Sequence, residues 1–144
     1  MPKGTGRLSL VGFFGLAVAA HAQTPLSQTA GSQFDGTYAL VSSTKLTEIF
    51  TQPQTGRTRP CPDWQVGPLT IVRGQARLSA VSTSHAVRAE FEGVVGSLGD
   101  LALRSVNPAY DAPAERLLNG RIDGTGTVRA RLISGCNFDY VWRK

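Results

Sequence analysis

The sequence predicts an all-β protein, either a small antiparallel up-and-down barrel or a strongly curled meander of seven to nine strands, closed by one disulfide. Three observations lead to this fold class. Apolar and polar residues alternate through most of the chain, and the spacing of an amphipathic helix is hard to find. Glycine-containing turns break the alternation about every ten residues. The only two cysteines, Cys61 and Cys136, lie far apart.

The start of the chain has the features of an export signal. Lys3 and Arg7 form a short basic start before an apolar stretch of 13 residues, Leu8–Ala20, which is too short to span a bilayer. Ala20-His21-Ala22 then places small residues at the two positions that a signal peptidase requires. We therefore predict a signal peptide at residues 1–22, cleaved after Ala22, a flexible lead-in at 23–33 and a single β domain at 34–144, in the periplasm or secreted.

The composition of the exported part favours one globular domain. Its 122 residues carry a net charge of +3, because cleavage removes two of the 15 basic residues and none of the 10 acidic ones. A chain of this length can bury about two thirds of its unfolded surface. We expect a monomer with no membrane span. Nucleic acid is a poor partner, because the aromatic residues fall on the predicted inner face.

Both cysteines lie in the exported part, where an even number predicts a disulfide. The bond would close a loop of 76 residues, which the chain-entropy model values at up to about 4.5 kcal/mol. A reactive thiol or a metal pair is the alternative. Two cysteines and the one exported histidine, His85, cannot complete a tetrahedral zinc site without carboxylates.

The strands are predicted in chain order from the alternation. Phe34–Tyr38 opens the first strand, and Leu69 and Ile71 lead through Arg73-Gly74 into Ala76–Ala80 as a hairpin. The next strand lies within Ala86–Val95. The last strand is expected to place four residues on its inner face, Cys136, Phe138, Tyr140 and Trp142, and to return to the first strand.

Two β-hairpins are predicted by an internal repeat. Gly93, Val95, Gly99, Leu101 and Arg104 recur 27 residues later as Gly120, Ile122, Gly126, Val128 and Arg131. We expect these glycines to occupy turns of positive φ. The two long breaks between strands, Thr51–Asp63 and Val106–Glu115, are the loops that could carry specificity.

Several of these pieces together carry a resemblance. They are Phe34-Asp35-Gly36-Thr37-Tyr38, Cys61-Pro62, Leu69-Thr70-Ile71, the two glycine hairpins and Cys136-Asn137-Phe138. Over residues 34–144 the chain resembles small exported bacterial two-cysteine β domains of unknown function. The resemblance implies the β fold, the disulfide and export, and no activity. A weaker likeness to avidin-type and lipocalin-type barrels rests on Gly36-Thr37-Tyr38, but only Trp64 and Trp142 are present where avidin-type sites use several tryptophans.

Enzyme chemistry has little support in the sequence. His85 follows Ser82-Thr83-Ser84 without a nucleophile turn. Glu90 and Glu92 would lie about 7 Å apart on one face of a strand, which suits a glycosidase pair, but nearby arginines favour ion pairs instead. Asp123-Gly124-Thr125-Gly126 lacks the further ligands of a calcium loop. We predict no catalytic residue, no metal site and no cofactor.

Binding has more support, from arginines on the polar positions of the strands. The exported part has 11 arginines and 2 lysines, and guanidinium groups suit carboxylates and phosphates. Arg121, Arg129 and Arg131 should share one face of a hairpin and form the predicted binding site, for an anionic component of the cell envelope or for a protein. The sequence therefore predicts an exported, non-catalytic binding or interaction module. The alternatives are a small carboxylate-based hydrolase and an inhibitor whose loop before Cys61 enters the cleft of a foreign enzyme.

Overall fold

A computed structural model of the chain describes residues 31–83, 88–106 and 116–144. Every regular element in these ranges is a β-strand, as the alternation predicts. The strands are β1 (Gly36–Lys45), β2 (Ile49–Thr51), β3 (Thr58–Pro60), β4 (Trp64–Val66), β5 (Leu69–Val72), β6 (Gln75–Ser82), β7 (Arg88–Val95), β8 (Asp100–Ser105), β9 (Leu117–Ile122), β10 (Thr127–Ile133) and β11 (Phe138–Arg143).

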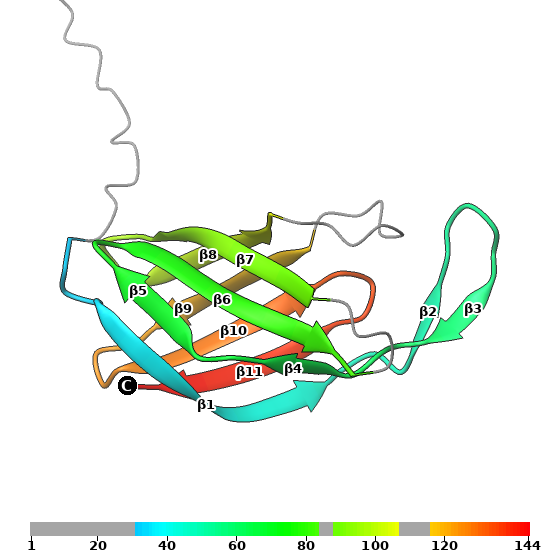
Figure 1. The fold of residues 1–144 in the computed structure, drawn as a ribbon, viewed down its shortest axis with the longest axis horizontal. Coiled ribbons are helices and arrows are strands. Elements are labelled where there is room, and N and C mark those ends of the chain that lie inside the picture. The colour runs from blue at the N-terminus through cyan, green and yellow to red at the C-terminus, as the bar shows by residue number, and fades with distance from the viewer. Residues whose placement is uncertain (1–30, 84–87, 107–115) are drawn as a thin grey trace, which may run out of the picture.

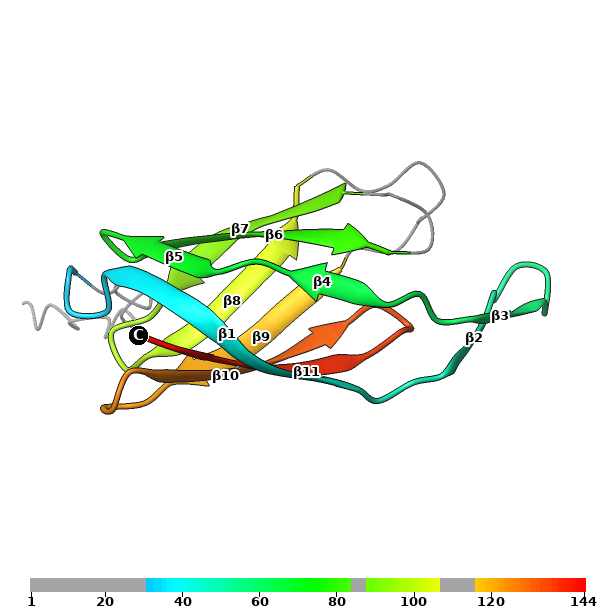
Figure 2. The same cartoon turned by 60° about the horizontal axis from the view of Figure 1, so that its bottom comes forward.

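Eight of the strands close into an antiparallel barrel (Figure 1). Each of β5 to β10 pairs with the next strand in chain order, and β1 closes the circle by pairing with both β5 and β11. The ninth strand of this sheet, β4, pairs with the far end of β6 (Figure 2). The predicted closure of the last strand on the first is therefore confirmed.

The core fills the barrel with the residues that the alternation predicts. In β11, Phe138, Tyr140 and Trp142 are at most 2% exposed. Ala76, Leu78 and Ala80 of β6 are buried as well. Consecutive inward rings of β11 contact one another, with centroids 5.9 Å and 5.5 Å apart. The predicted alternation of inward and outward side chains is thus confirmed for β6 and β11.

The hairpin between β5 and β6 has the tight turn expected at Arg73-Gly74. Both residues have positive φ, 50° and 73°, as the two central residues of a type I′ turn require. The carboxylate of Asp35 accepts hydrogen bonds from both of their backbone N–H groups, at 2.9 Å and 3.3 Å. The segment before β1 therefore fixes this turn.

The 27-residue repeat corresponds to the β7–β8 and β9–β10 hairpins. Gly96 N donates to Asp100 O and Gly99 N to Gly96 O, and the same two bonds recur from Asp123 N to Thr127 O and from Gly126 N to Asp123 O. Of the repeated glycines, Gly99 and Gly126 have positive φ, at 89° and 78°.

The expectation of positive φ is wrong for the other two repeated glycines. Gly93 and Gly120 lie inside strands, and neither has positive φ. A Cβ on Gly93 would collide with the carbonyl oxygen of Ala102, and one on Gly120 would collide with the backbone of β10. Close approach of neighbouring strands therefore requires these glycines.

The disulfide joins Cys61 to Cys136, as predicted, with Cα atoms 5.6 Å apart. Both cysteines are buried, and the described residues contain no free cysteine. The bond links the segment before β4 to the segment before β11. It thereby ties the two sides of the barrel at one end.

Near the disulfide, β1 and β4 lie on either side of an opening in the sheet and do not pair with each other. Tyr38 of β1 still pairs with Leu69 of β5, but Pro68 has no N–H to extend the ladder. Gly67 uses its groups elsewhere: its N–H donates to Ser79 O at 2.8 Å, and its carbonyl accepts from Trp142 Nε1 at 3.1 Å. From this point β1 pairs with β11 alone.

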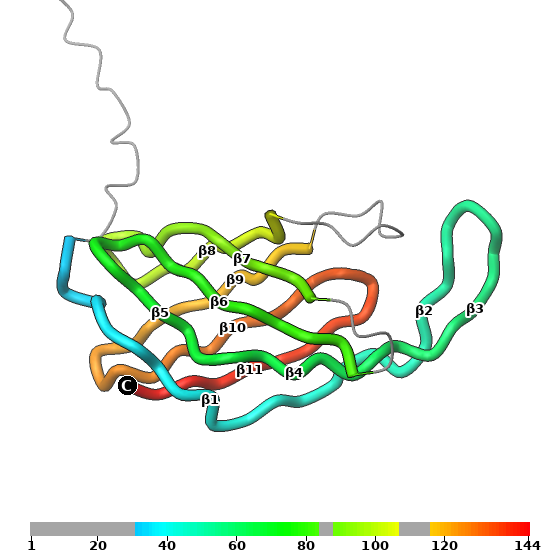
Figure 3. Tube along the Cα trace, viewed as in Figure 1, coloured from blue at the N-terminus to red at the C-terminus, as the bar shows by residue number. Residues whose placement is uncertain are grey.

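The predicted loop Thr51–Asp63 is partly regular structure. The strands β2 and β3 form a two-stranded hairpin that projects from the end of the barrel (Figure 3). We call residues 48–61 the arm. Of the other long break, Val106–Glu115, residues 107–115 lie outside the described residues. No helix among the described residues is long and apolar enough to cross a membrane.

Candidate functional site

The predicted arginine site lies on the outside of the β9–β10 hairpin. Arg121 of β9 is directly opposite Arg129 of β10, and Arg131 is directly opposite Asn119. All three arginines are exposed because they occupy the outward positions of the alternation. The structure thus brings the three predicted side chains onto one face, which we call the arginine face.

The three guanidinium groups differ in whether they form ion pairs with neighbouring carboxylates. Arg131 binds Asp139 of β11 through two hydrogen bonds, at 2.7 Å and 2.9 Å. These bonds hold the pKa of Asp139 below its usual range and raise that of Arg131. Neither Arg121 nor Arg129 forms an ion pair in the described part of the chain. Asp100, opposite Arg121 on β8, offsets part of the positive charge in this row.

A shallow, open hollow of about 410 Å³ adjoins these arginines. Its lining comes from three adjacent strands and consists of Asn119, Arg129, Ala130, Arg131, Asp139, Tyr140 and Val141. Arg129 brings a cation that forms no ion pair within the described residues, although its charge contributes to the lowered pKa of Asp123. The Arg131–Asp139 pair and Asn119 bring further polar groups. A carboxylate or phosphate group could therefore meet a guanidinium fork here.

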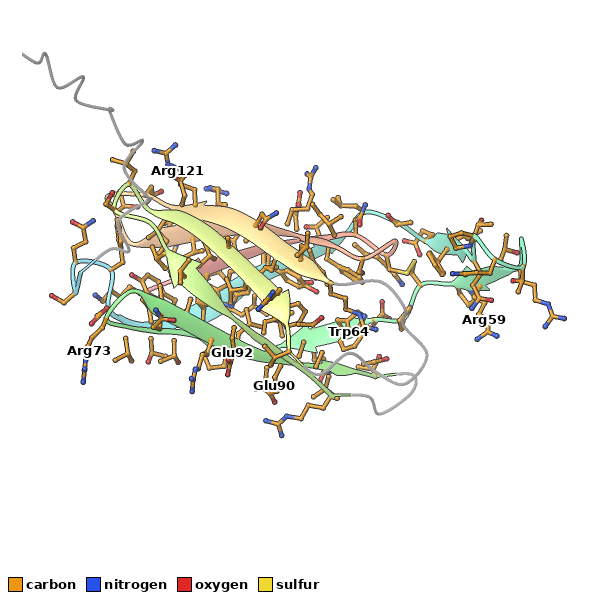
Figure 4. The ribbon with its side chains drawn as sticks, turned by 90° about the horizontal axis from the view of Figure 1, so that it is seen from above. Arg59, Trp64, Arg73, Glu90, Glu92 and Arg121 are labelled. Atoms are coloured by element: carbon orange, nitrogen blue, oxygen red, sulfur yellow. A yellow bond between two sulfur atoms is a disulfide. The ribbon has the colours of Figure 1, made fainter. Side chains whose placement is uncertain are left out.

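The carboxylates considered for hydrolysis are occupied by neighbours. Glu90 accepts hydrogen bonds from Ser79 and Arg88, both at 2.6 Å, and these bonds lower its pKa. Glu92 forms an ion pair with Arg77 at 3.6 Å. Figure 4 shows both glutamates on the side of the barrel opposite Arg121. A lowered pKa keeps Glu90 ionised, the wrong state for a general acid.

The remaining predicted polar residues have structural partners or lie outside the description. Asp123 accepts hydrogen bonds from the side chain of Thr125 and from the N–H groups of Thr125 and Thr127, which lower its pKa. It therefore acts as a turn residue. His85 lies outside the described residues. No cluster of three or more possible metal-ligating His, Cys, Asp or Glu occurs in the part of the chain that is described.

The arm is held at its base by contacts with the barrel. Cys61 N donates to Glu48 O at 2.8 Å, which continues the β2–β3 ladder down to the disulfide. The ring of Phe50 lies against Gly135, where an added Cβ would be 2.5 Å from a ring carbon. Beyond this base the β3 residues are exposed, and Arg59 projects from the arm (Figure 4).

The end of the barrel near the arm holds a polar group that the sequence analysis did not single out. The guanidinium of Arg116 lies over the ring of Trp64, 5.0 Å from its centroid. Its Nη1 atom and the hydroxyl of Tyr140 are buried, and neither has a hydrogen-bond partner among the described residues. Burial lowers the pKa of Arg116 and raises that of Tyr140. The alternation could have indicated that Arg116 points inward, because it precedes the inward Leu118 by two residues and residues two apart share a face of a strand.

Comparison with known proteins identified no relative: no family model, curated protein or solved structure matches the chain.

Proposed function

We propose that this chain is an exported, non-catalytic binding protein that takes an anionic group on its arginine face. The observation that carries the proposal is the pairing of Arg121 with Arg129 across two strands, with no ion pair to either within the described residues, beside the hollow. The resemblance to exported two-cysteine β domains agrees with export and carries no activity. Carboxylates and phosphates are the anionic groups that guanidinium forks fit best.

The exposed position of the arginines makes the proposal testable without damage to the fold. Exposed ion pairs contribute roughly 0–1 kcal/mol each, so replacing the arginines should leave the barrel intact. A contact made by exposed charges should weaken with salt, because the screening length falls from about 10 Å at 0.1 M to about 3 Å at 1 M.

The test compares retention on polygalacturonate, on inorganic polyphosphate and on neutral dextran. The wild type should bind one or both anionic polymers at low salt and release them at high salt. The triple variant Arg121→Gln, Arg129→Gln, Arg131→Gln should lose this retention. A matched variant, Arg57→Gln, Arg59→Gln, Arg73→Gln, loses the same charge elsewhere and should keep it. Equal behaviour of the two variants, or retention that ignores salt, would overturn the arginine face.

A second candidate function, inhibition of a foreign enzyme, is favoured by the arm. A two-stranded hairpin is marginally stable alone, yet this one is fixed by the disulfide and by Phe50 against Gly135. A preorganised projecting segment of this kind suits insertion into a cleft. Arg57, beside the turn of the arm, and the exposed Arg59 on β3 favour an acidic cleft.

Activity assays on a panel of secreted peptidases and muramidases test this second function. Inhibition by the wild type that is lost in Arg57→Ala, Arg59→Ala and kept in Arg73→Ala would support it. A panel left uninhibited, or inhibition that the arm variant retains, would remove it.

Export itself is part of the proposal. The A-x-A ending at Ala22 predicts a mature protein that starts at Gln23. The intact mass of protein recovered from the periplasm or medium should correspond to residues 23–144 with the disulfide formed. A species that retains Met1 contradicts the predicted cleavage.

A further inference from the structure

We propose that the free edge of β1 is a dimer contact, through which two copies of this chain pair strand to strand. This inference does not depend on the arginine face. It starts from the separation of β1 from β4, which leaves part of a strand with one neighbour.

Residues 39–45 of β1 pair with β11 on one side only. On the other side no strand among the described residues pairs with them, since β5 pairs only with residues 36–38 and β4 pairs only with β6. An unpaired edge presents a row of N–H and C=O groups that can template another strand.

The direction of these groups follows from the β1–β11 ladder. Leu46 N donates to Asn137 O at 2.9 Å, one position beyond the Lys45–Phe138 pair. Successive residues of an antiparallel strand direct their N–H and C=O groups to opposite sides. Thr44 and Leu46 therefore face β11, whereas Ser43 and Lys45 face the free edge.

The edge lacks most of the features that usually prevent pairing. Residues 39–44 contain no charged residue and no proline, and all six are exposed. Leu40 and Val41 are 37% and 55% exposed, and Leu46 and Ile49 continue the apolar surface at 46% and 63%. The single charge, Lys45, is paired with Asp63 at 2.9 Å. Only the bulge at Val41 interrupts the strand.

These properties favour a second copy as the occupant. Two antiparallel edges related by a twofold axis place each residue opposite another member of the same segment. Because residues 39–44 are uncharged, no like charges meet across that axis. The exposed leucine and valine side chains would be covered on both copies at once. The proposed dimer differs from the monomer that the sequence analysis expects.

The test is sedimentation equilibrium of the oxidised protein from Gln23 onward over a wide concentration range. The wild type should show a monomer–dimer equilibrium. Val41→Lys places a cation on the edge and should raise the dissociation constant at least about tenfold, which corresponds to about 1.4 kcal/mol. Val72→Lys is the matched control, because Val72 is also 55% exposed but lies on β5, which is paired with β1 and β6.

A second variant tests the backbone contact itself. Ser43→Pro removes an N–H that faces the free edge and spares the ladder to β11, so it should abolish the dimer while the unfolding midpoint stays near that of the wild type. A monomer at every concentration would overturn the proposal. The same result is expected if a different polypeptide, rather than a second copy, pairs with the edge of β1. A dimer that tolerates both Val41→Lys and Ser43→Pro would also overturn it.

Discussion

Single residues of β11 show how side-chain parity determines stability. Phe138 and Trp142 are buried in the core, while the side chain of Asn137 accepts one hydrogen bond, from Ser134 N at 3.3 Å. We predict that Phe138→Ala and Trp142→Ala each lower the free energy of unfolding by about 3–5 kcal/mol. Asn137→Ala should cost about 1 kcal/mol or less.

Chemical denaturation midpoints of the three variants check this prediction. Trp142→Ala should cost at least as much as Phe138→Ala, because it also removes the hydrogen bond to the Gly67 carbonyl. Equal midpoints for all three variants would mean that the register of β11 is wrong.

The Arg131–Asp139 pair predicts a pH dependence. Its hydrogen bonds lower the pKa of Asp139 in the folded state, so the pair stabilises fully above the unfolded value, about 3.9. The stabilisation is lost as pH falls through the lower, folded pKa. Asp139→Asn should therefore cost roughly 1 kcal/mol or less near pH 7, since both side chains are partly exposed.

The difference in stability between Asp139→Asn and the wild type should shrink as the pH falls below about 4. Urea unfolding at pH 7 and at successively lower pH measures it. A difference that stays constant across this range would show that the ion pair contributes nothing to the pH dependence.

The sequence predicted which side chains point outward but, for most of them, not which residues they contact. The outward arginines followed from alternation, which needs only the chain's own period. Most partners did not: Arg131 pairs with Asp139 and Glu90 with Ser79 because of strand register. The Arg88–Glu90 pair lies within β7 and follows from the alternation, as the sequence predicts. Register depends on bulges and turn lengths, such as the irregularity between Leu40 and Ser42.

At the scale of elements, the two repeated hairpins show why one residue type serves two purposes. Gly99 and Gly126 supply positive φ at turns, whereas Gly93 and Gly120 allow strands to approach closely. Sequence alone could locate the glycines but could not separate these purposes, because the second depends on the neighbouring strand.

Gly93→Ala tests the close approach. Its new Cβ would collide with the carbonyl of Ala102, which is backbone and cannot rotate away, so we expect a loss of about 1–3 kcal/mol. Gly124→Ala is the control, because nothing lies within 4 Å of its added Cβ. Thermal or chemical unfolding measures both, and a Gly93→Ala variant as stable as the Gly124→Ala variant would contradict the account.

The arm is the element that the sequence indicated least. The segment Thr51–Asp63 was predicted to be an irregular loop because it contains Pro53, Gly56 and Pro60. Its strands are only three residues long, and they form beside a disulfide whose second cysteine is 75 residues away. Such long-range restraint leaves no periodic signal in the arm's own residues.

At the scale of the whole molecule, the barrel, its closure and its disulfide could be predicted because each leaves a local mark: a period of two, glycine turns and paired cysteines. The opening between β1 and β4 could not. It results from Pro68 and from the two hydrogen bonds of Gly67, whose partners Ser79 and Trp142 come from separate parts of the chain.

The central claim is that binding occurs on the outer arginine face. The most direct measurement is the change in backbone amide NMR shifts as oligogalacturonate or polyphosphate is added to the labelled protein at low salt. If anions bind to the arginine face, the largest shifts will lie in β9, β10 and β11, around Arg121, Arg129 and Val141, and will reverse on addition of salt. Shifts confined to the arm or to the Trp64 end of the barrel, or no shifts with either polymer, would contradict this claim.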